Sequence, residues 1–170
     1  MLDLAGIAGD SIVDGPGIRT AIFAQGCPHH CPGCHNPETW EFGRGTQVPA
    51  EAVAEMVKAN PLCRGVTFSG GEPFAQAGEF AALGRLLREA GYEVAAYTGY
   101  TFEQLLNGTA EQRALLETID VLIDGPFVQS ERSLELNFRG SRNQRILNVP
   151  ASLKEGRAVE ETSRRWLGEY

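Results

Sequence analysis

Runs of apolar residues along this chain predict a series of short buried strands. Four runs are rich in β-branched or other apolar residues, and each is followed by a glycine. Such runs are typical of strands in the interior of a protein. A fifth strand is expected within 138–149, where a polar loop leads into an apolar segment. The four runs cover residues 18–25, 65–69, 93–98 and 120–124.

Apolar residues spaced three or four positions apart predict helices between these strands. The segment 49–58 starts with Pro49, carries its acids early and ends at Lys58, as amphipathic helices often do. The segment 79–90 has an apolar stripe and is followed by Gly91, a residue that favours the end of a helix. Two shorter helical pieces and a terminal helix or tail are expected over 102–106, 110–118 and 150–170.

The order of these elements predicts an α/β protein with a mostly parallel sheet. A complete (β/α)8 barrel typically needs about 250 residues, whereas this chain has 170. We therefore expect one domain over residues 1–170, with an incomplete barrel that is open on one side. Such an opening would suit a protein segment as the substrate.

Charge and hydropathy narrow the classes of function. The net charge is −7, and recognition of phosphates needs clustered lysines and arginines, so no nucleic-acid partner is expected. No segment approaches 18 consecutive apolar residues, and the N-terminus lacks the basic and apolar regions of a signal peptide. The sequence therefore predicts a cytoplasmic protein with no membrane partner.

Three of the four cysteines and all three histidines lie within ten positions, 27 to 36. The spacing of Cys27, Cys31 and Cys34 would place three thiols on one face of a helix. Pro28 and Pro32 argue against a helix, because each removes a backbone donor and clashes with the preceding turn. The thiols therefore sit on a loop that follows a predicted strand, at the sheet edge where α/β proteins build active sites.

The number of thiols indicates which metal centre this loop suits. Structural zinc takes four closed ligands, and an ordinary electron-carrying [4Fe-4S] cluster takes four cysteines. Three thiolates would leave one iron of such a cluster without a protein ligand. Cys63 lies far from the loop in sequence, and we expect it to be a small buried residue rather than a fourth ligand. A zinc-binding interaction module is the alternative from another class of function.

The spacing Cys27-x3-Cys31-x2-Cys34 resembles the cluster loop of the radical S-adenosylmethionine (SAM) enzymes. The resemblance implies an incomplete barrel of the radical SAM type, a [4Fe-4S] cluster on these cysteines, and SAM on the open iron. Gly70-Gly71-Glu72, at the end of the second predicted strand, resembles the motif of that family that binds the methionyl amino group. Two glycines allow close approach of the main chain, and a carboxylate can accept hydrogen bonds from an ammonium group.

The same resemblance implies further contacts with SAM. Main-chain atoms of Gly33, Cys34 and His35 would lie beside the adenine, and Thr98 would lie at the same rim. Asp124 would bind the ribose hydroxyls, although an aspartate at this position would equally cap the next turn. Arg139 would neutralise the SAM carboxylate, with a solvent-exposed arginine as the alternative.

Three longer strings resemble the activases that install glycyl radicals. Asp-Gly-Pro-Gly-x-Arg at 14–19, by composition only a surface turn, and Asn-Pro-Glu-Thr-Trp at 36–40 flank the cysteines. Arg-Gly-Ser-x-Asn-Gln at 139–144 resembles the activating proteins of anaerobic (class III) ribonucleoside-triphosphate reductases.

This resemblance implies a radical SAM activase that receives an electron from flavodoxin or a similar reductant. It would cleave SAM and generate a glycyl radical on the large subunit of the reductase, with no side chain needed as acid or base. An activase of another glycyl radical enzyme, such as pyruvate formate-lyase, is the alternative among enzymes.

Overall fold

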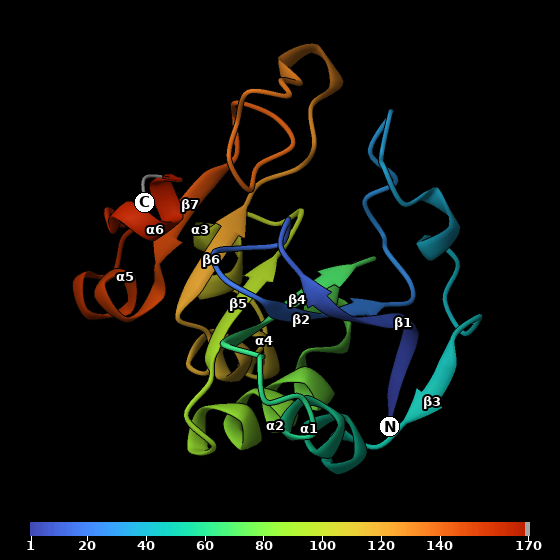
Figure 1. Cartoon of the computed structure of the whole chain (residues 1–170). Coiled ribbons are helices and arrows are strands. Elements are labelled where there is room, and N and C mark those ends of the chain that lie inside the picture. Colours follow the sequence, from blue (N-terminus) through green and yellow to red (C-terminus); the bar gives the residue numbers. More distant parts are fainter. Residues whose placement is uncertain (169–170) are drawn as a thin grey trace.

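The computed structural model describes residues 1–168, and their strands form a single open sheet (Figure 1). The strand order is β3-β1-β2-β4-β5-β6-β7, so β3 and β7 are the two outermost strands. The strands are β1 (Leu2–Ser11), β2 (Arg19–Ala24), β3 (Thr46–Val48), β4 (Gly65–Gly70), β5 (Glu93–Tyr97), β6 (Val121–Asp124) and β7 (Arg145–Asn148).

The four central strands, β2, β4, β5 and β6, run parallel and are those predicted from the apolar runs. The outer strands are antiparallel: β1 pairs with β2 and β3, and β7 pairs with β6. The expectation of a mostly parallel sheet is therefore correct only for its centre. Strand β1 escaped prediction because only Leu2 and Leu4 of its ten residues are buried, so it carries a weak apolar signal.

Capping residues determine where several helices begin. Thr101 and Thr109 each accept a hydrogen bond from the backbone three residues later and start α3 and α4 with complete capping boxes. Asn148 caps α5, which ends at Gly156 in the left-handed conformation. No helix in the described part of the chain is long and apolar enough to cross a membrane. The helices are α1 (Ala50–Lys58), α2 (Ala77–Glu89), α3 (Phe102–Leu106), α4 (Ala110–Leu116), α5 (Val149–Glu155) and α6 (Arg164–Leu167).

The main core lies between one face of the sheet and the helices. Ile22, Phe68 and Leu122 from the central strands are fully buried there, with Phe80 of α2 packed edge-on against the ring of Phe68. Burying a side chain of this size stabilises the fold by about 1.5–3 kcal/mol. The helices α1, α2, α3 and α4 all contribute to this core.

The C-terminal segment covers part of the other face of the sheet. Trp166 of α6 is 1% exposed and packs in a second cluster with Val121 and Ile123. The sequence left open whether 150–170 forms a helix or a tail. Through residue 168 it forms two short helices, α5 and α6, while residues 169 and 170 lie outside the described part of the chain.

A buried arginine organises this second face. The side chain of Arg19 is 1% exposed; its Nε donates to Thr67 Oγ1 at 2.9 Å and its Nη1 donates to Glu93 Oε1 at 2.9 Å. The ring of Trp166 lies 5.4 Å from the Arg19 guanidinium carbon, within the range of a cation–π contact. Burial lowers the pKa of Arg19, and the charge of Glu93 opposes that shift. The arginine thus joins β2, β4, β5 and α6.

The same arginine anchors the Asp14–Gly17 turn. Nη1 of Arg19 donates to the carbonyl oxygen of Pro16 at 3.3 Å, and a side chain at Gly15 would come within 2.8 Å of the arginine. Gly15 and Pro16 are buried, whereas Gly17 is exposed. A surface turn, the simplest expectation from the composition, is therefore correct only for part of this segment.

Replacing Arg19 by methionine should lower the free energy of unfolding by about 3 kcal/mol, because the buried Thr67 and the partly buried Glu93 each lose a donor. Urea denaturation of the purified protein measures this value. The matched control is Arg165→Ala: Arg165 also pairs with Glu93, at 2.7 Å, but its side chain is 56% exposed. This control should cost less than about 1 kcal/mol. Equal losses for the two variants would contradict the assigned role of Arg19.

Candidate functional site

The loops that follow the four parallel strands meet around one cavity. Parallel strands place their carboxyl ends at a common edge, and here these ends are Ala24, Gly70, Tyr97 and Asp124. The cavity has a volume of about 260 Å³. Its wall includes Asp14, Cys27, His29, Cys31, Cys34, His35, Asn36, Thr39, Trp40, Ser69, Gly70, Gly71, Tyr97, Thr98, Gly99, Gly125, Phe127, Gly140 and Gln144.

The cysteine loop is irregular, as its prolines predict. The backbone nitrogen of Cys27 donates to the carbonyl of Trp40 at 3.0 Å, which closes the loop at its base. A tight turn follows, in which the nitrogen of Cys34 donates to the carbonyl of Cys31 at 3.0 Å. Gly33 and His30 have φ values of +77° and +47°, and these left-handed conformations bend the chain back on itself.

All three loop cysteines contribute to the wall of the cavity, and none forms a disulfide. Cys27 is buried, whereas Cys31 and Cys34 are partly exposed. Burial raises the pKa of the Cys27 thiol, although the backbone N–H groups of His29 and His30 oppose the shift. Bound metal favours the thiolate over the thiol. Three thiols converging on one cavity are the donors that an iron–sulfur cluster takes.

Cys63 lies far from this cavity. Its Sγ donates to the carbonyl of Gly65 at 3.1 Å and contacts Thr20 Oγ1 at 3.4 Å, within the main core. Gly65 begins β4 and Gly70 ends it, so about 16 Å of strand separates the two ends. Cys63 is therefore a buried core residue, as its isolation in the sequence predicted, and it cannot reach a metal held by the loop.

Each of the three histidine rings has its own neighbour. Nε2 of His29 lies 2.6 Å from Glu72 Oε1. The ring of His30 stacks on Trp40 with centroids 4.7 Å apart, and His35 packs edge-on against Phe127 at 5.3 Å. Among the described residues, no three Cys, His, Asp or Glu side chains gather closely enough to share a single metal ion.

The Gly70-Gly71 pair packs directly against the base of the cysteine loop. Gly70 has φ of +90°, and a side chain there would lie 2.6 Å from the backbone nitrogen of Ala24. A side chain at Gly71 would lie 2.3 Å from the carbonyl oxygen of Gly26. Only glycine fits at either position, so this motif brings the end of β4 and the start of the loop into contact at the cavity wall.

Glu72 lies behind this wall rather than on it. Its side chain is fully buried, and Oε1 accepts hydrogen bonds from His29 Nε2 at 2.6 Å and from the Gly99 nitrogen at 2.8 Å. Oε2 accepts from the Phe74 nitrogen at 3.0 Å, and the Thr98 hydroxyl lies 2.9 Å from both oxygens. The sequence predicted a carboxylate facing a ligand ammonium group. The structure instead places it among donors of the protein.

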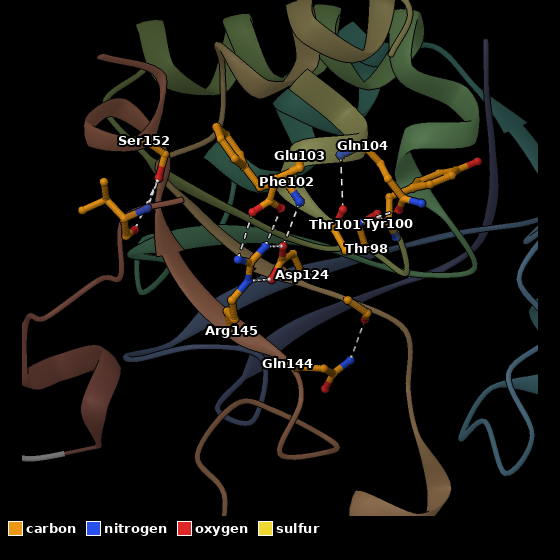
Figure 2. A network of polar contacts seen from close by, with 12 residues as sticks. Thr98, Tyr100, Thr101, Phe102, Glu103, Gln104, Asp124, Gln144, Arg145 and Ser152 are labelled. Carbon is orange, nitrogen blue, oxygen red and sulfur yellow. Dashed lines mark hydrogen bonds and ion pairs between the residues drawn. The ribbon is translucent and has the colours of Figure 1, made fainter. Parts of the chain in front are cut away.

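The carboxylate of Asp124, like that of Glu72, accepts hydrogen bonds from donors of the protein itself. Figure 2 shows its carboxylate between the guanidinium of Arg145 and the backbone nitrogen of Phe102, which donate at 3.0 and 2.8 Å. Arg145 also pairs with Glu103, and hydrogen bonds to the two carboxylates raise the pKa of the arginine. Asp124 is 1% exposed and is not part of the cavity wall. Asp124 receives the first N–H of α3, a helix that precedes it in the chain, rather than capping the turn that follows it.

The Arg-Gly-Ser-x-Asn-Gln string builds another side of the cavity. Gln144 Oε1 accepts from the nitrogens of Gly140 and Ser141 at 2.8 and 3.2 Å. Its Nε2 donates to the Gly125 carbonyl at 3.1 Å, and Figure 2 shows the dashed line that leaves this nitrogen. Gln144 and Gly140 contribute to the wall, whereas the partly buried Arg139 donates to the carbonyl of Gln144 at 3.2 Å and does not. Gln144 was missed as a site residue, although it ends the quoted string.

The structure thus brings together seven of the eleven residues predicted for the site. Those that form the wall are Cys27, Cys31, Cys34, His35, Gly70, Gly71 and Thr98. Gly33 lies on the outer side of the loop, where a side chain would meet Gln129 at 2.9 Å. Those outside the wall are Gly33, Glu72, Asp124 and Arg139.

Cys63→Ala and Cys31→Ala should separate the core thiol from the loop thiols. We expect Cys63→Ala to keep the iron content of anaerobically reconstituted protein unchanged and to lower the free energy of unfolding by about 1 kcal/mol, because only a small core volume is lost. Cys31→Ala should lose most of the iron. Iron analysis per chain measures both, and loss of iron from Cys63→Ala would contradict the placement of that thiol.

Comparison with known families supports an iron–sulfur site. The chain matches the family described as 4Fe-4S single cluster domain over residues 13–147. That range contains the three loop cysteines and the Gly70–Glu72 turn. The match favours an iron–sulfur cluster over the zinc-binding module that the cysteine count alone left open.

Several relatives carry the name anaerobic ribonucleoside-triphosphate reductase-activating protein. The one from Vibrio cholerae serotype O1 is 37% identical over 144 residues, which cover 79% of this chain and 90% of the relative. The one from Escherichia coli K12 is 34% identical over 141 residues, 78% of this chain and 90% of the relative. That of bacteriophage T4 is 32% identical over 140 residues, 79% and 86% of the two chains.

Among solved structures, QueE from Escherichia coli is similar to this chain with a TM-score of 0.50 and 20% sequence identity. The similar region covers 59% of this chain and 53% of that chain. At this level of identity the likeness concerns the fold alone.

Proposed function

The chain belongs to the family of anaerobic ribonucleoside-triphosphate reductase-activating proteins, and from this premise we propose how its residues carry out the activation. It is a radical SAM activase that generates a glycyl radical on the large subunit of the anaerobic reductase. These relatives confirm the family that the three sequence strings predicted. They favour it over the alternative, an activase of pyruvate formate-lyase. We place this activity in the cytoplasm.

The proposed reaction uses one electron and one molecule of SAM for each glycyl radical. A [4Fe-4S] cluster with bound SAM would supply reductive cleavage: one electron from flavodoxin or a similar donor would give methionine and a 5′-deoxyadenosyl group able to take a Cα hydrogen from a glycine. The protein's own part is to bind, orient and exclude water. Tyr97, at the end of β5, donates a hydrogen bond from its hydroxyl to the Phe138 carbonyl at 2.7 Å, and burial raises its pKa.

Cys27, Cys31 and Cys34 would hold three irons of the cluster and leave the fourth free for SAM. The position of Cys63 supports this, because that thiol lies in the core at the opposite end of β4. The hydrogen bond from His29 to Glu72 supports it as well, because that ring nitrogen is already engaged with a protein oxygen. An iron without a protein ligand is the feature on which this chemistry depends.

The remaining wall residues, together with Gly33 and Arg139 from the adjoining loops, would hold SAM itself. Main-chain groups of Gly70 and Gly71 are proposed to bind the methionyl amino group, with Thr98 beside them, because these residues form the wall next to the cysteine loop. Gly33, Cys34 and His35 would lie along the adenine. Arg139 remains our proposal for the SAM carboxylate, because its Nε is buried without a hydrogen-bond partner. Glu72 and Asp124 would act by holding these loops in place.

The open side of the sheet would give the substrate segment access to the cavity. We propose that the sheet is an incomplete barrel of the radical SAM type and that the whole chain acts as one domain, since all described strands belong to one sheet. The reductase segment that carries the glycine would enter along the open side. The observation that carries the proposal is that the three loop cysteines and the Gly-Gly turn line one cavity in a chain of this family.

Protein reconstituted with iron and sulfide without oxygen should release 5′-deoxyadenosine from SAM when a strong reductant is added. It should also produce a glycyl radical signal by electron paramagnetic resonance (EPR) on the purified large subunit of the anaerobic reductase. Chromatography of the nucleoside product measures the first outcome. Cys31→Ala should give neither product, because the cluster lacks a ligand.

Cys63→Ala is the matched control, since it removes a thiol that lies away from the cavity, and it should keep wild-type cleavage. An iron-loaded wild-type protein that releases no 5′-deoxyadenosine under strong reductant would show the proposed function to be wrong.

A further inference from the structure

One carboxylate connects three separate parts of the site. Glu72 is fully buried, and its hydrogen-bond donors come from the cysteine loop, from its own turn and from the end of β5. A buried carboxylate is costly unless donors surround it. The protein places these donors on the segments that must be aligned around the cavity, namely residues 29, 74 and 98–99.

His29 supplies the side-chain contact from the cysteine loop to the Glu72 carboxylate, while the backbone nitrogen of Glu72 donates to the Gly26 carbonyl at 2.8 Å at the base of the loop. Nε2 of His29 lies 2.6 Å from Glu72 Oε1, and its ring packs edge-on against Tyr100 with centroids 4.5 Å apart. A side chain at Gly99 would come within 2.5 Å of the imidazole, so the absence of a side chain there makes room for the ring. The ring is thus held by two residues that follow β5 as well as by Glu72.

We infer that His29 is a positioning residue for SAM, which acts through Glu72 by fixing the cysteine loop relative to the Gly70-Gly71 turn. The inference rests on the proposed function, because it assigns the cluster to one side of this hydrogen bond and the SAM amino group to the other. SAM must contact the cluster, so the loop that holds the cluster and the turn that holds SAM must keep a fixed position relative to each other. His29 and Glu72 form the side-chain link between the loop and the turn.

The other hydrogen bonds of Glu72 indicate what should happen when the side chain of His29 is removed. Without His29, Glu72 still accepts from Thr98, Gly99 and Phe74, so the carboxylate remains satisfied and the turn keeps its shape. The three thiols also remain on the loop. The loss should therefore appear in the binding of SAM rather than in the binding of iron.

The test compares three variants of the anaerobically reconstituted protein. His29→Ala removes the link, and His29→Gln keeps an N–H donor at nearly the position of Nε2. His30→Asn is the matched control: it changes a neighbouring loop residue that stacks on Trp40 and makes no contact with Glu72. Asparagine suits the control because His30 has a positive φ of 47°, which asparagine tolerates.

Two readouts are taken besides activity: iron per chain, and the change that SAM causes in the EPR spectrum of the reduced cluster, titrated to give a dissociation constant. We expect His29→Ala to keep its iron and to bind SAM about tenfold more weakly, the effect of one net hydrogen bond. His29→Gln should recover to within about threefold of the wild-type value. His30→Asn should bind SAM as the wild-type protein does.

Unchanged SAM binding in His29→Ala would overturn the inference, as would a His29→Gln variant no better than the alanine. Loss of iron from His29→Ala would also overturn it, because the residue would then serve only to build the cluster loop. In each case a wild-type spectrum that responds to SAM leaves the proposed function intact. A wild-type protein whose spectrum ignores SAM would remove the proposed function and this inference with it.

Discussion

The parallel pairing of β2, β4, β5 and β6 is the constraint on which the site depends. Because the strands run in one direction, every loop that leaves their carboxyl ends emerges at the same edge. The cysteine loop, the Gly-Gly turn and the residues after Tyr97 and Asp124 are therefore neighbours in space, although up to about a hundred positions separate them in sequence. A cavity forms there without any loop having to cross the sheet.

Buried charged groups stabilise this arrangement from both sides. Arg19 lies within one face of the sheet, while Glu72 and Asp124 lie behind the cavity wall, and each is exposed by 1% or less. Each is compensated by partners on several elements, so each joins segments that hydrophobic packing alone would leave free to shift. Glycines make the close approach possible, most clearly at Gly70 and Gly71, where any side chain would strike the neighbouring backbone.

The cysteine loop and the ends of the central strands were predicted from local features, and the structure confirms both. The prolines identified a loop at the cysteines, and the glycines after each apolar run marked the ends of the four central strands. Strand β1 was missed because it is largely exposed, and β7 was expected but not its antiparallel direction. The Asp14–Gly17 turn was expected at the surface, yet its two central residues are buried beside the guanidinium of Arg19.

The sequence by itself determined the candidate cysteine donors, the order of the central parallel strands and their helices, and the family, because these follow from residue types at short spacings. Only the tertiary structure decided which polar side chains face the cavity. Glu72 and Asp124 follow strands in the way that ligand-binding carboxylates do, but their partners, His29 and Arg145, come from distant segments. A carboxylate can bind a ligand or satisfy the protein's own donors, and which of the two occurs depends on what the fold packs against it.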